Sequence, residues 1–189
     1  MDDSRNRVCP VELSSSLDSK VRRWLQNPHK ILAPYISDGM TALDVGCGPG
    51  FFTIELANLV GSTGRVIAAD LQEGMLQRLR AKIGGTEYER RISLVQCTTD
   101  SINVSDPVDF ILTFYMVHEV PNKKGFFEQL HRVLAKTGQY LLVEPKLFHV
   151  SEEEFQATLD IARRTGFEVS DGPKLLLSWS ALLRKMKDS

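Results

Sequence analysis

The sequence predicts an α/β fold built on a largely parallel, doubly wound sheet. Short apolar runs typical of buried strands alternate with segments whose apolar residues recur every three or four positions. A glycine-rich turn over 46–50 joins one such strand to one such helix. The last two apolar runs, 167–169 and 175–183, flank a turn that is too short for a crossover, so they are expected to form an antiparallel hairpin.

The individual elements follow from the same patterns. Apolar residues at helical spacing predict a helix over 13–25. Asn27-Pro28 is typical of an N-cap followed by proline at the first helical position, and this second helix is expected to end near Asp38-Gly39. Strands are then expected over 41–45, 65–70, 92–96, 108–114 and 139–143, and helices over 50–60, 73–83, 123–134 and 151–165.

The composition is that of one ordinary globular domain. The 189 residues are 42% hydrophobic and 25% charged, which is enough apolar material for a full core. We expect residues 28–189 to form this domain and residues 1–27 to add an N-terminal helical segment. A net charge of −1 provides no overall attraction to nucleic acid.

The cysteines and the apolar runs restrict the setting of the protein. Cys9, Cys47 and Cys97 are sparse and odd in number, which is unlike a secreted disulfide framework. Without a Cys-x-x-Cys pair or a His/Cys cluster, we expect no metal site. The polar start lacks the apolar core of a signal peptide and no apolar run is long enough to span a bilayer, so a cytoplasmic location is expected.

The glycine-rich turn favours a particular nucleotide ligand. A dinucleotide-binding turn has a small residue where this chain has Phe51, and an acid at Asp44 would repel phosphate. S-adenosylmethionine has no phosphate and carries a positive amino group and a sulfonium. Asp70 ends the next strand, where a carboxylate can accept hydrogen bonds from both ribose hydroxyls. These residues therefore favour S-adenosylmethionine over NAD.

At these motifs the chain resembles the class I S-adenosylmethionine-dependent methyltransferases. It is most similar to small prokaryotic members near the ubiquinone and menaquinone C-methyltransferases and the arsenite methyltransferases. The resemblance covers about residue 28 to the end and rests on 43–50, Asp70 and 132–138. It implies a Rossmann-like seven-stranded sheet of order 3-2-1-4-5-7-6 with strand seven antiparallel, which agrees with the predicted hairpin.

The resemblance also implies which residues bind the cofactor. The acid that family members carry after strand three is replaced here by Thr98, so either Thr98 or Asp100 contacts the adenine amino group. The backbone of Gly46, Cys47 and Gly48 would contact the methionine part. The remaining implied contacts are Asp44 beneath the loop, Asp70 on the ribose, Leu71 on the adenine, Cys97 near the adenine end, and Phe114 beside the methionine part.

Acceptor chemistry is less explicit. After the strand over 108–114, His118 and Glu119 are the best base candidates, followed by Tyr115. The alternative is that His118 packs at a loop junction and Glu119 faces water. Glu144-Pro145-Lys146 could reach the same rim or form a solvated loop. A helix over 13–25 could close the site as a lid, and arginines facing inward from it would favour an anionic substrate.

Several functions remain open from the sequence. The leading prediction is methyl transfer to a small-molecule acceptor, because the chain lacks the Asn/Asp-Pro-Pro-Tyr motif of amino-directed nucleic-acid methyltransferases. An RNA or protein methyltransferase would use a basic stripe at Lys20, Arg22, Arg23 and Lys30. A non-catalytic S-adenosylmethionine-binding module is a third possibility, and an NAD-dependent dehydrogenase a distant fourth. A soft metalloid acceptor held by Cys9 and Cys97 is a further hypothesis.

Overall fold

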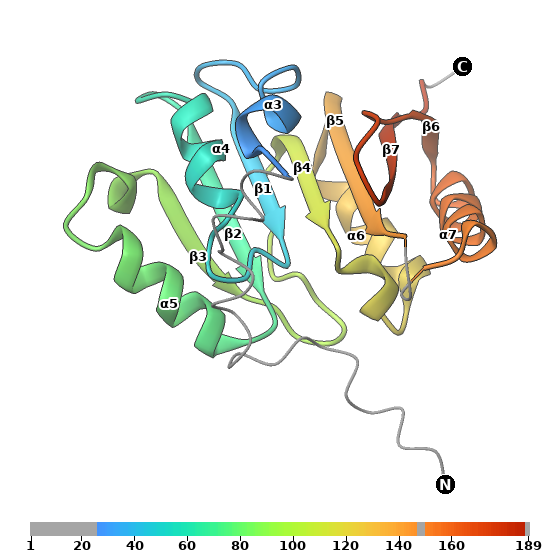
Figure 1. Ribbon diagram of the computed structural model, residues 1–189, viewed down its shortest axis with the longest axis horizontal. Helices are drawn as coiled ribbons and strands as arrows, with labels where there is room; N and C mark the ends of the chain where they lie inside the picture. The colour runs from blue at the N-terminus through green and yellow to red at the C-terminus, as the bar shows by residue number, and fades with distance from the viewer. Residues whose placement is uncertain (1–25, 147–149, 188–189) are drawn as a thin grey trace, which may run out of the picture.

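The computed structural model describes residues 26–146 and 150–187. These residues form one seven-stranded sheet in the order β3-β2-β1-β4-β5-β7-β6 (Figure 1). Strands β1 to β5 are parallel, and β7 is antiparallel to both β5 and β6. The predicted strand order and the hairpin are thereby confirmed. The strands are β1 Thr41–Val45, β2 Arg65–Asp70, β3 Ile92–Gln96, β4 Val108–Phe114, β5 Leu134–Pro145, β6 Phe167–Asp171 and β7 Ser178–Lys185.

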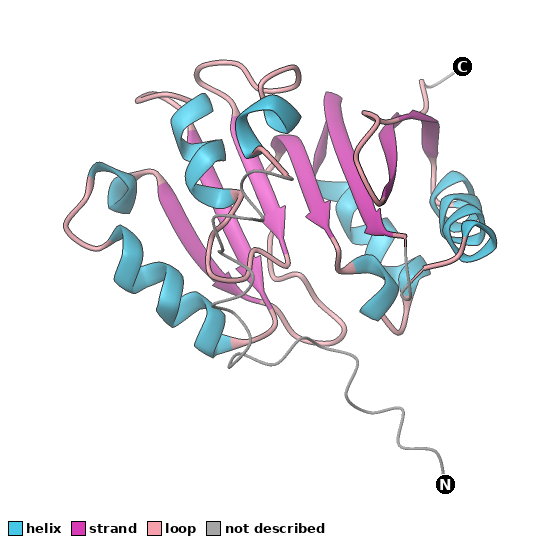
Figure 2. Ribbon diagram, in the orientation of Figure 1, coloured by secondary structure: helices cyan, strands magenta, loops and turns pink. Residues whose placement is uncertain are grey.

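Helices cover the two faces of the sheet (Figure 2). Because successive residues of a strand point to opposite faces, the central strands contribute alternately to two apolar clusters. One cluster includes residues of α3, α4 and α5, and the other includes residues of α6 and α7. The helices are α3 Pro28–Leu32, α4 Thr53–Leu59, α5 Glu73–Ile83, α6 Lys123–Val133 and α7 Glu152–Arg164, with short 3₁₀ turns η2 Glu87–Arg90 and η3 Val117–Glu119.

Most predicted boundaries match within a few residues, and the last strand, predicted over 175–183, spans Ser178–Lys185. The helix begun at Pro28 ends at Leu32, well before residue 38, because Pro34 has no amide N–H with which to continue the helical hydrogen bonds. The helix predicted over 50–60 begins at Thr53, since 50–52 still belong to the glycine-rich turn. Strand β5 extends back to Leu134, which pairs with β4. The helix predicted over 13–25, and with it the lid, lies outside the described residues.

The strand order places a topological switch point between β1 and β4. From β1 the chain winds outward through β2 to β3, then returns to β4 on the opposite side of β1. In open α/β sheets a ligand binds outside the carboxyl ends of the strands at such a point. The predicted site residues lie at or just after the carboxyl ends of β1, β2, β3 and β4, so the topology brings them to one edge of the sheet.

Candidate functional site

The loop after β1 is shaped by glycines with positive φ. Gly46, Gly48 and Gly50 have φ of 74°, 53° and 90°, a region that L side chains rarely adopt. The amides of Gly46 and Cys47 both donate to the carbonyl of Ala69, at 2.8 and 3.1 Å, which ties the loop to β2. A Cβ on Gly48 would meet no described atom within 4 Å. The loop therefore exposes bare backbone at the switch point.

Asp44 anchors the helix that follows this loop. It is 2% exposed and lies on the face of β1 that α4 covers. The hydroxyl of Thr53, at the start of α4, donates to Asp44 Oδ2 at 2.6 Å. Sequence reasoning singled out Asp44 but missed Thr53, although a hydroxyl in the first helical turn was a usable signal. The contact holds the start of α4 against β1.

Asp70 joins β2 to the glycine-rich loop. Its Oδ2 accepts from the Gly48 amide and its Oδ1 accepts from the Gln72 amide, both at 2.8 Å. Burial raises the pKa of Asp70, and the amides of Gln72, Gly48 and Leu71 oppose that rise. A carboxylate has about four acceptor sites, so these amide bonds leave acceptor capacity for ligand hydroxyls. Asp70 is thus positioned to accept hydrogen bonds from a ligand that lies beside the loop backbone.

Thr98 and Asp100, two of the residues expected near adenine, lie in a turn after β3. Thr98 donates its amide to the Ser101 carbonyl at 2.8 Å and accepts from the Ser101 amide through its hydroxyl oxygen at 3.1 Å. Asp100 is exposed, and its carbonyl accepts from Gln129 at 2.9 Å. Leu71, predicted to lie against adenine, is 40% exposed. Which of Thr98 and Asp100 reaches adenine stays a prediction.

The described cysteines are poor soft-metal ligands. Burial, with the charge of Asp70 adding to it, raises the pKa of Cys97 to about 12. Burial also raises the pKa of Cys47 well above its usual value, again helped by nearby aspartates. Thiolate is the form that binds soft metals, so both residues favour structural roles. Cys9 lies outside the described residues.

Phe114 and Tyr115 lie at the carboxyl end of β4, beside the switch point. Phe114 packs against Phe52 and Tyr115, with ring centroids 4.2 and 4.5 Å apart. Tyr115 has a φ of 62°, and its hydroxyl lies 2.5 Å from Ser178 Oγ. Since the Ser178 hydroxyl donates to the Leu176 carbonyl, Tyr115 donates to Ser178. The Tyr115 oxygen also accepts from Gln26 at 2.8 Å.

These bonds bear on the prediction that Tyr115 is a base. Its one hydroxyl proton is already donated to Ser178, and its oxygen already accepts from Gln26. To act as a base, Tyr115 needs its oxygen directed at the proton that the methyl acceptor loses. These contacts hold Tyr115 at the end of β4, and its role as a base stays a prediction.

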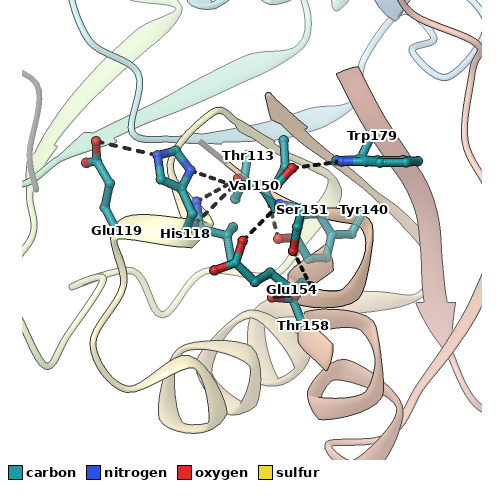
Figure 3. A network of polar contacts seen from close by, with 11 residues as sticks. Thr113, His118, Glu119, Tyr140, Val150, Ser151, Glu154, Thr158 and Trp179 are labelled. Carbon is teal, nitrogen blue, oxygen red and sulfur yellow. Dashed lines mark hydrogen bonds and ion pairs between the residues drawn. The ribbon is translucent and has the colours of Figure 1, made fainter. Parts of the chain in front are cut away.

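His118 and Glu144 form a close pair at the carboxyl ends of β4 and β5. His118 Nδ1 lies 2.6 Å from Glu144 Oε2, and Glu144 is 2% exposed. Glu144 also accepts from the amides of Val117 at 2.9 Å and His118 at 3.2 Å. Figure 3 shows Glu119 on the other side of the ring, with its Oε1 3.9 Å from His118 Nε2. Glu144 is therefore part of the buried structure and not of a solvated loop.

The surroundings of His118 favour its protonated form. Burial acts to lower its pKa, and the charge of Lys123 acts in the same direction. The hydrogen bond and charge of Glu144, together with the charge of Glu119, outweigh both, so the pKa of His118 lies above its usual value. A shifted imidazole at the edge of a switch point is a candidate for acid–base chemistry.

Fold and site together define a class I S-adenosylmethionine-dependent methyltransferase. The chain belongs to the family described as a methyltransferase domain, whose family model matches residues 36–181. The predicted family and its cofactor, S-adenosylmethionine, are confirmed by this match and by the relatives described next.

The chain is similar to curated and structurally solved methyltransferases. Over 107 residues it is 31% identical to "Ubiquinone/menaquinone biosynthesis C-methyltransferase UbiE" of Klebsiella pneumoniae, covering 56% of this chain and 43% of that one. The chain thus spans less than half the length of this relative. A solved S-adenosylmethionine-dependent methyltransferase from Aquifex aeolicus has a TM-score of 0.80 and 26% identity, covering 93% of this chain and 99% of its own. A TehB-like enzyme from Corynebacterium glutamicum has a TM-score of 0.72 at 16% identity, covering 94% and 100%, and shares the fold.

The described residues fit this cofactor. Gly48 presents backbone that a side chain would otherwise cover, and the Asp70 carboxylate lies 2.8 Å from its amide. In the same ranges, 26–146 and 150–187, no group of three or more His, Cys, Asp or Glu side chains could hold a metal ion. None of the helices described there is long and apolar enough to cross a membrane.

Proposed function

We propose that this chain transfers a methyl group from S-adenosylmethionine to a small-molecule acceptor by in-line displacement. The observation that carries the proposal is the contact between Asp70 and the Gly48 amide at the switch point, in a chain of this family. When bound, S-adenosylmethionine supplies an electrophilic methyl group on a sulfonium. The named UbiE relatives are C-methyltransferases of quinone biosynthesis, which supports a small-molecule acceptor.

In this proposal the cofactor is held mainly on the β1–β2 side. The backbone of 46–48 binds the methionine part, with Asp44 bracing the loop from below through Thr53. Asp70 accepts from the ribose hydroxyls, Leu71 lies against the adenine, and Phe114 lines the methionine part. The protein's contribution is then to align the acceptor and exclude water, since the methyl group is already activated.

Calorimetry with S-adenosylhomocysteine and with NADH tests the cofactor assignment. We expect S-adenosylhomocysteine, the product of methyl transfer, to bind and NADH not to bind. Asp70→Ala should weaken product binding about 10- to 100-fold, since a hydrogen bond to a charged group contributes about 1.5–3 kcal/mol. Asp160→Ala, which removes an exposed acid on α7, is the matched control and should change nothing. NADH binding without product binding would overturn the proposal.

Turnover is tested separately from binding. Formation of S-adenosylhomocysteine from S-adenosylmethionine is measured with fractionated small-molecule extracts and with total RNA as acceptor pools. We expect turnover with a small-molecule fraction. Turnover with RNA alone would favour the alternative nucleic-acid methyltransferase, and product binding without any turnover would favour a non-catalytic binding module.

A further inference from the structure

We propose that Glu144 is a positioning residue that holds His118 in its Nδ1–H tautomer, so that Nε2 of His118 takes the proton of the methyl acceptor. The inference rests on the proposed function and deepens it. It assigns a class of acceptor: a nucleophile that must lose an O–H, N–H or activated C–H proton, as opposed to a soft atom that is methylated through a lone pair.

The tautomer follows from the donors around Glu144. Its Oε1 accepts from the Val117 amide, and its Oε2 accepts from the His118 amide, at 2.9 and 3.2 Å. An ionised carboxylate only accepts hydrogen bonds, so the imidazole nitrogen 2.6 Å from Oε2 must be the donor. In neutral imidazole, a proton on Nδ1 leaves Nε2 as the basic nitrogen.

Glu144 fixes the position of the His118 ring through more than one contact. The two amides that Glu144 caps belong to η3, the same short turn that carries the imidazole. One buried side chain therefore fixes both the backbone and the ring of His118. Glu144 is 2% exposed, whereas the His118 side chain keeps 23% of its surface exposed. The pair thus has a buried end at Nδ1 and a ring that reaches the surface.

The other charges near the ring suit proton uptake. Glu119 Oε1 lies 3.9 Å from Nε2, which is too far for a hydrogen bond but close enough to stabilise an imidazolium. Lys123, from α6, is the nearby cation and acts against protonation. Glu144 at the end of β5 supplies the strongest stabilisation of the charged ring. Two carboxylates therefore face the imidazolium that forms when the acceptor loses its proton.

The step balances in atoms and charge. The acceptor atom bonds to the methyl carbon while the carbon–sulfur bond breaks, and sulfur keeps the bonding pair. The acceptor proton passes to Nε2 of His118, and the imidazolium later releases it to water. An arsenite-type acceptor needs no such base, and burial raises the pKa of both described cysteines, which disfavours the thiolate that would bind it.

Nitrogen NMR of the full chain, labelled with ¹⁵N-histidine and saturated with S-adenosylhomocysteine, tests the positioning. Above the pKa of His118, we expect a protonated Nδ1 and an unprotonated Nε2. The opposite tautomer in the unmutated protein overturns the proposal without any variant. Because calorimetry reports product binding independently, this failure is distinct from a failure of the proposed function.

Variants then separate positioning from general structure. Glu144→Gln should lower the pKa of His118 and abolish the preference for Nδ1–H, since an amide can donate as well as accept. Glu119→Gln should lower that pKa less and leave the tautomer unchanged. The titration of His131 in the same spectra serves as an internal control and should not move. An unaltered His118 titration in Glu144→Gln would contradict the proposal.

The acceptor class is tested with three probes: catechol for O–H, benzylamine for N–H and arsenite for a lone-pair nucleophile. Turnover of catechol or benzylamine should fall at least about 100-fold in His118→Gln, because a general base contributes about 10²–10⁴-fold. Product affinity should stay unchanged. Arsenite turnover that survives in His118→Gln would overturn the assigned class.

Discussion

The two sides of the switch point are built by different means. On the β1–β2 side, the site is made of loop backbone, shaped by Gly46, Gly48 and Gly50 and tied down by Asp70. On the β4–β5–β7 side, it is made of side chains that meet from distant segments, such as His118 with Glu144 and Tyr115 with Ser178. Under the proposed function, the first side binds the cofactor and the second side contacts the methyl acceptor.

The largest expected effect comes from Gly46→Ala on the backbone side. A Cβ there would lie 2.8 Å from Met116 Cγ, and φ is already 74°. The left-handed backbone costs about 1–2 kcal/mol for a residue with a side chain. Moving Met116 adds about 1–3 kcal/mol. We expect urea unfolding to show a free energy of unfolding that is lower by the sum of these two costs. The affinity for S-adenosylhomocysteine should fall as well.

Gly48→Ala is the matched control for that change. Its φ is 53°, but the added Cβ would contact no described atom within 4 Å. Gly48→Ala should lower the free energy of unfolding only by the cost of the left-handed backbone, about 1–2 kcal/mol. Equal losses of stability in the two variants would show that Met116 does not press on the loop.

The next effect compares one buried threonine from each side. Thr53→Val removes a hydroxyl that donates to the Asp44 carboxylate, and Thr113→Val removes one bonded to the Tyr140 hydroxyl at 2.8 Å. Hydrogen bonds to charged groups contribute about 1.5–3 kcal/mol and neutral ones about 0.5–1.5 kcal/mol. Thr53→Val should therefore cost more in urea unfolding. A larger loss in Thr113→Val would reverse the comparison.

A smaller effect is expected from the Tyr115–Ser178 contact on the side-chain side. Ser178→Ala and Tyr115→Phe each remove one hydroxyl from this bond. Each should lower the free energy of unfolding by about 0.5–1.5 kcal/mol. The double variant should lose less than the two single losses together, because both remove the same bond. Strict additivity in this double-mutant cycle would mean that the contact contributes nothing.

The smallest effect is a pH-dependent difference in melting temperature. The pKa of His118 is raised in the folded state, so its stabilisation is complete below the ordinary value of 6.5 and is lost as pH rises through the folded pKa. The melting temperature of the unmutated protein minus that of His118→Gln should therefore shrink from about pH 6 to about pH 9.

His131→Gln provides a control of opposite sign. Burial, together with the charge of Lys185, lowers the pKa of His131. Its contribution to stability therefore falls as pH drops through 6.5. If both histidine variants showed the same trend with pH, the raised pKa assigned to His118 would be wrong.

The sequence predicts the β1–β2 side of the site better than the β4–β5–β7 side. The glycines, Asp44 and Asp70 can be predicted from the sequence, because each lies at a strand end or in a turn that a short stretch of sequence identifies. Glu144 was visible only as a polar residue after a strand, and its partner is 26 positions away. Ser178 is 63 positions from Tyr115, and nothing in either local pattern links them.

The sequence by itself determined the alternation of strands and helices, the C-terminal hairpin and the glycine-rich loop, because hydrophobic periodicity and positive φ are properties of short segments. The strand order was predicted only through the resemblance to a known family. Tertiary structure decided which polar side chains meet at the carboxyl ends of β4 and β5. Parallel pairing of β4 with β5 places Phe114 beside Val143, so the residues after them converge on one edge. Antiparallel pairing of β7 brings Ser178 to the end of β5. Those contacts depend on pairing across the whole chain, which no local pattern encodes.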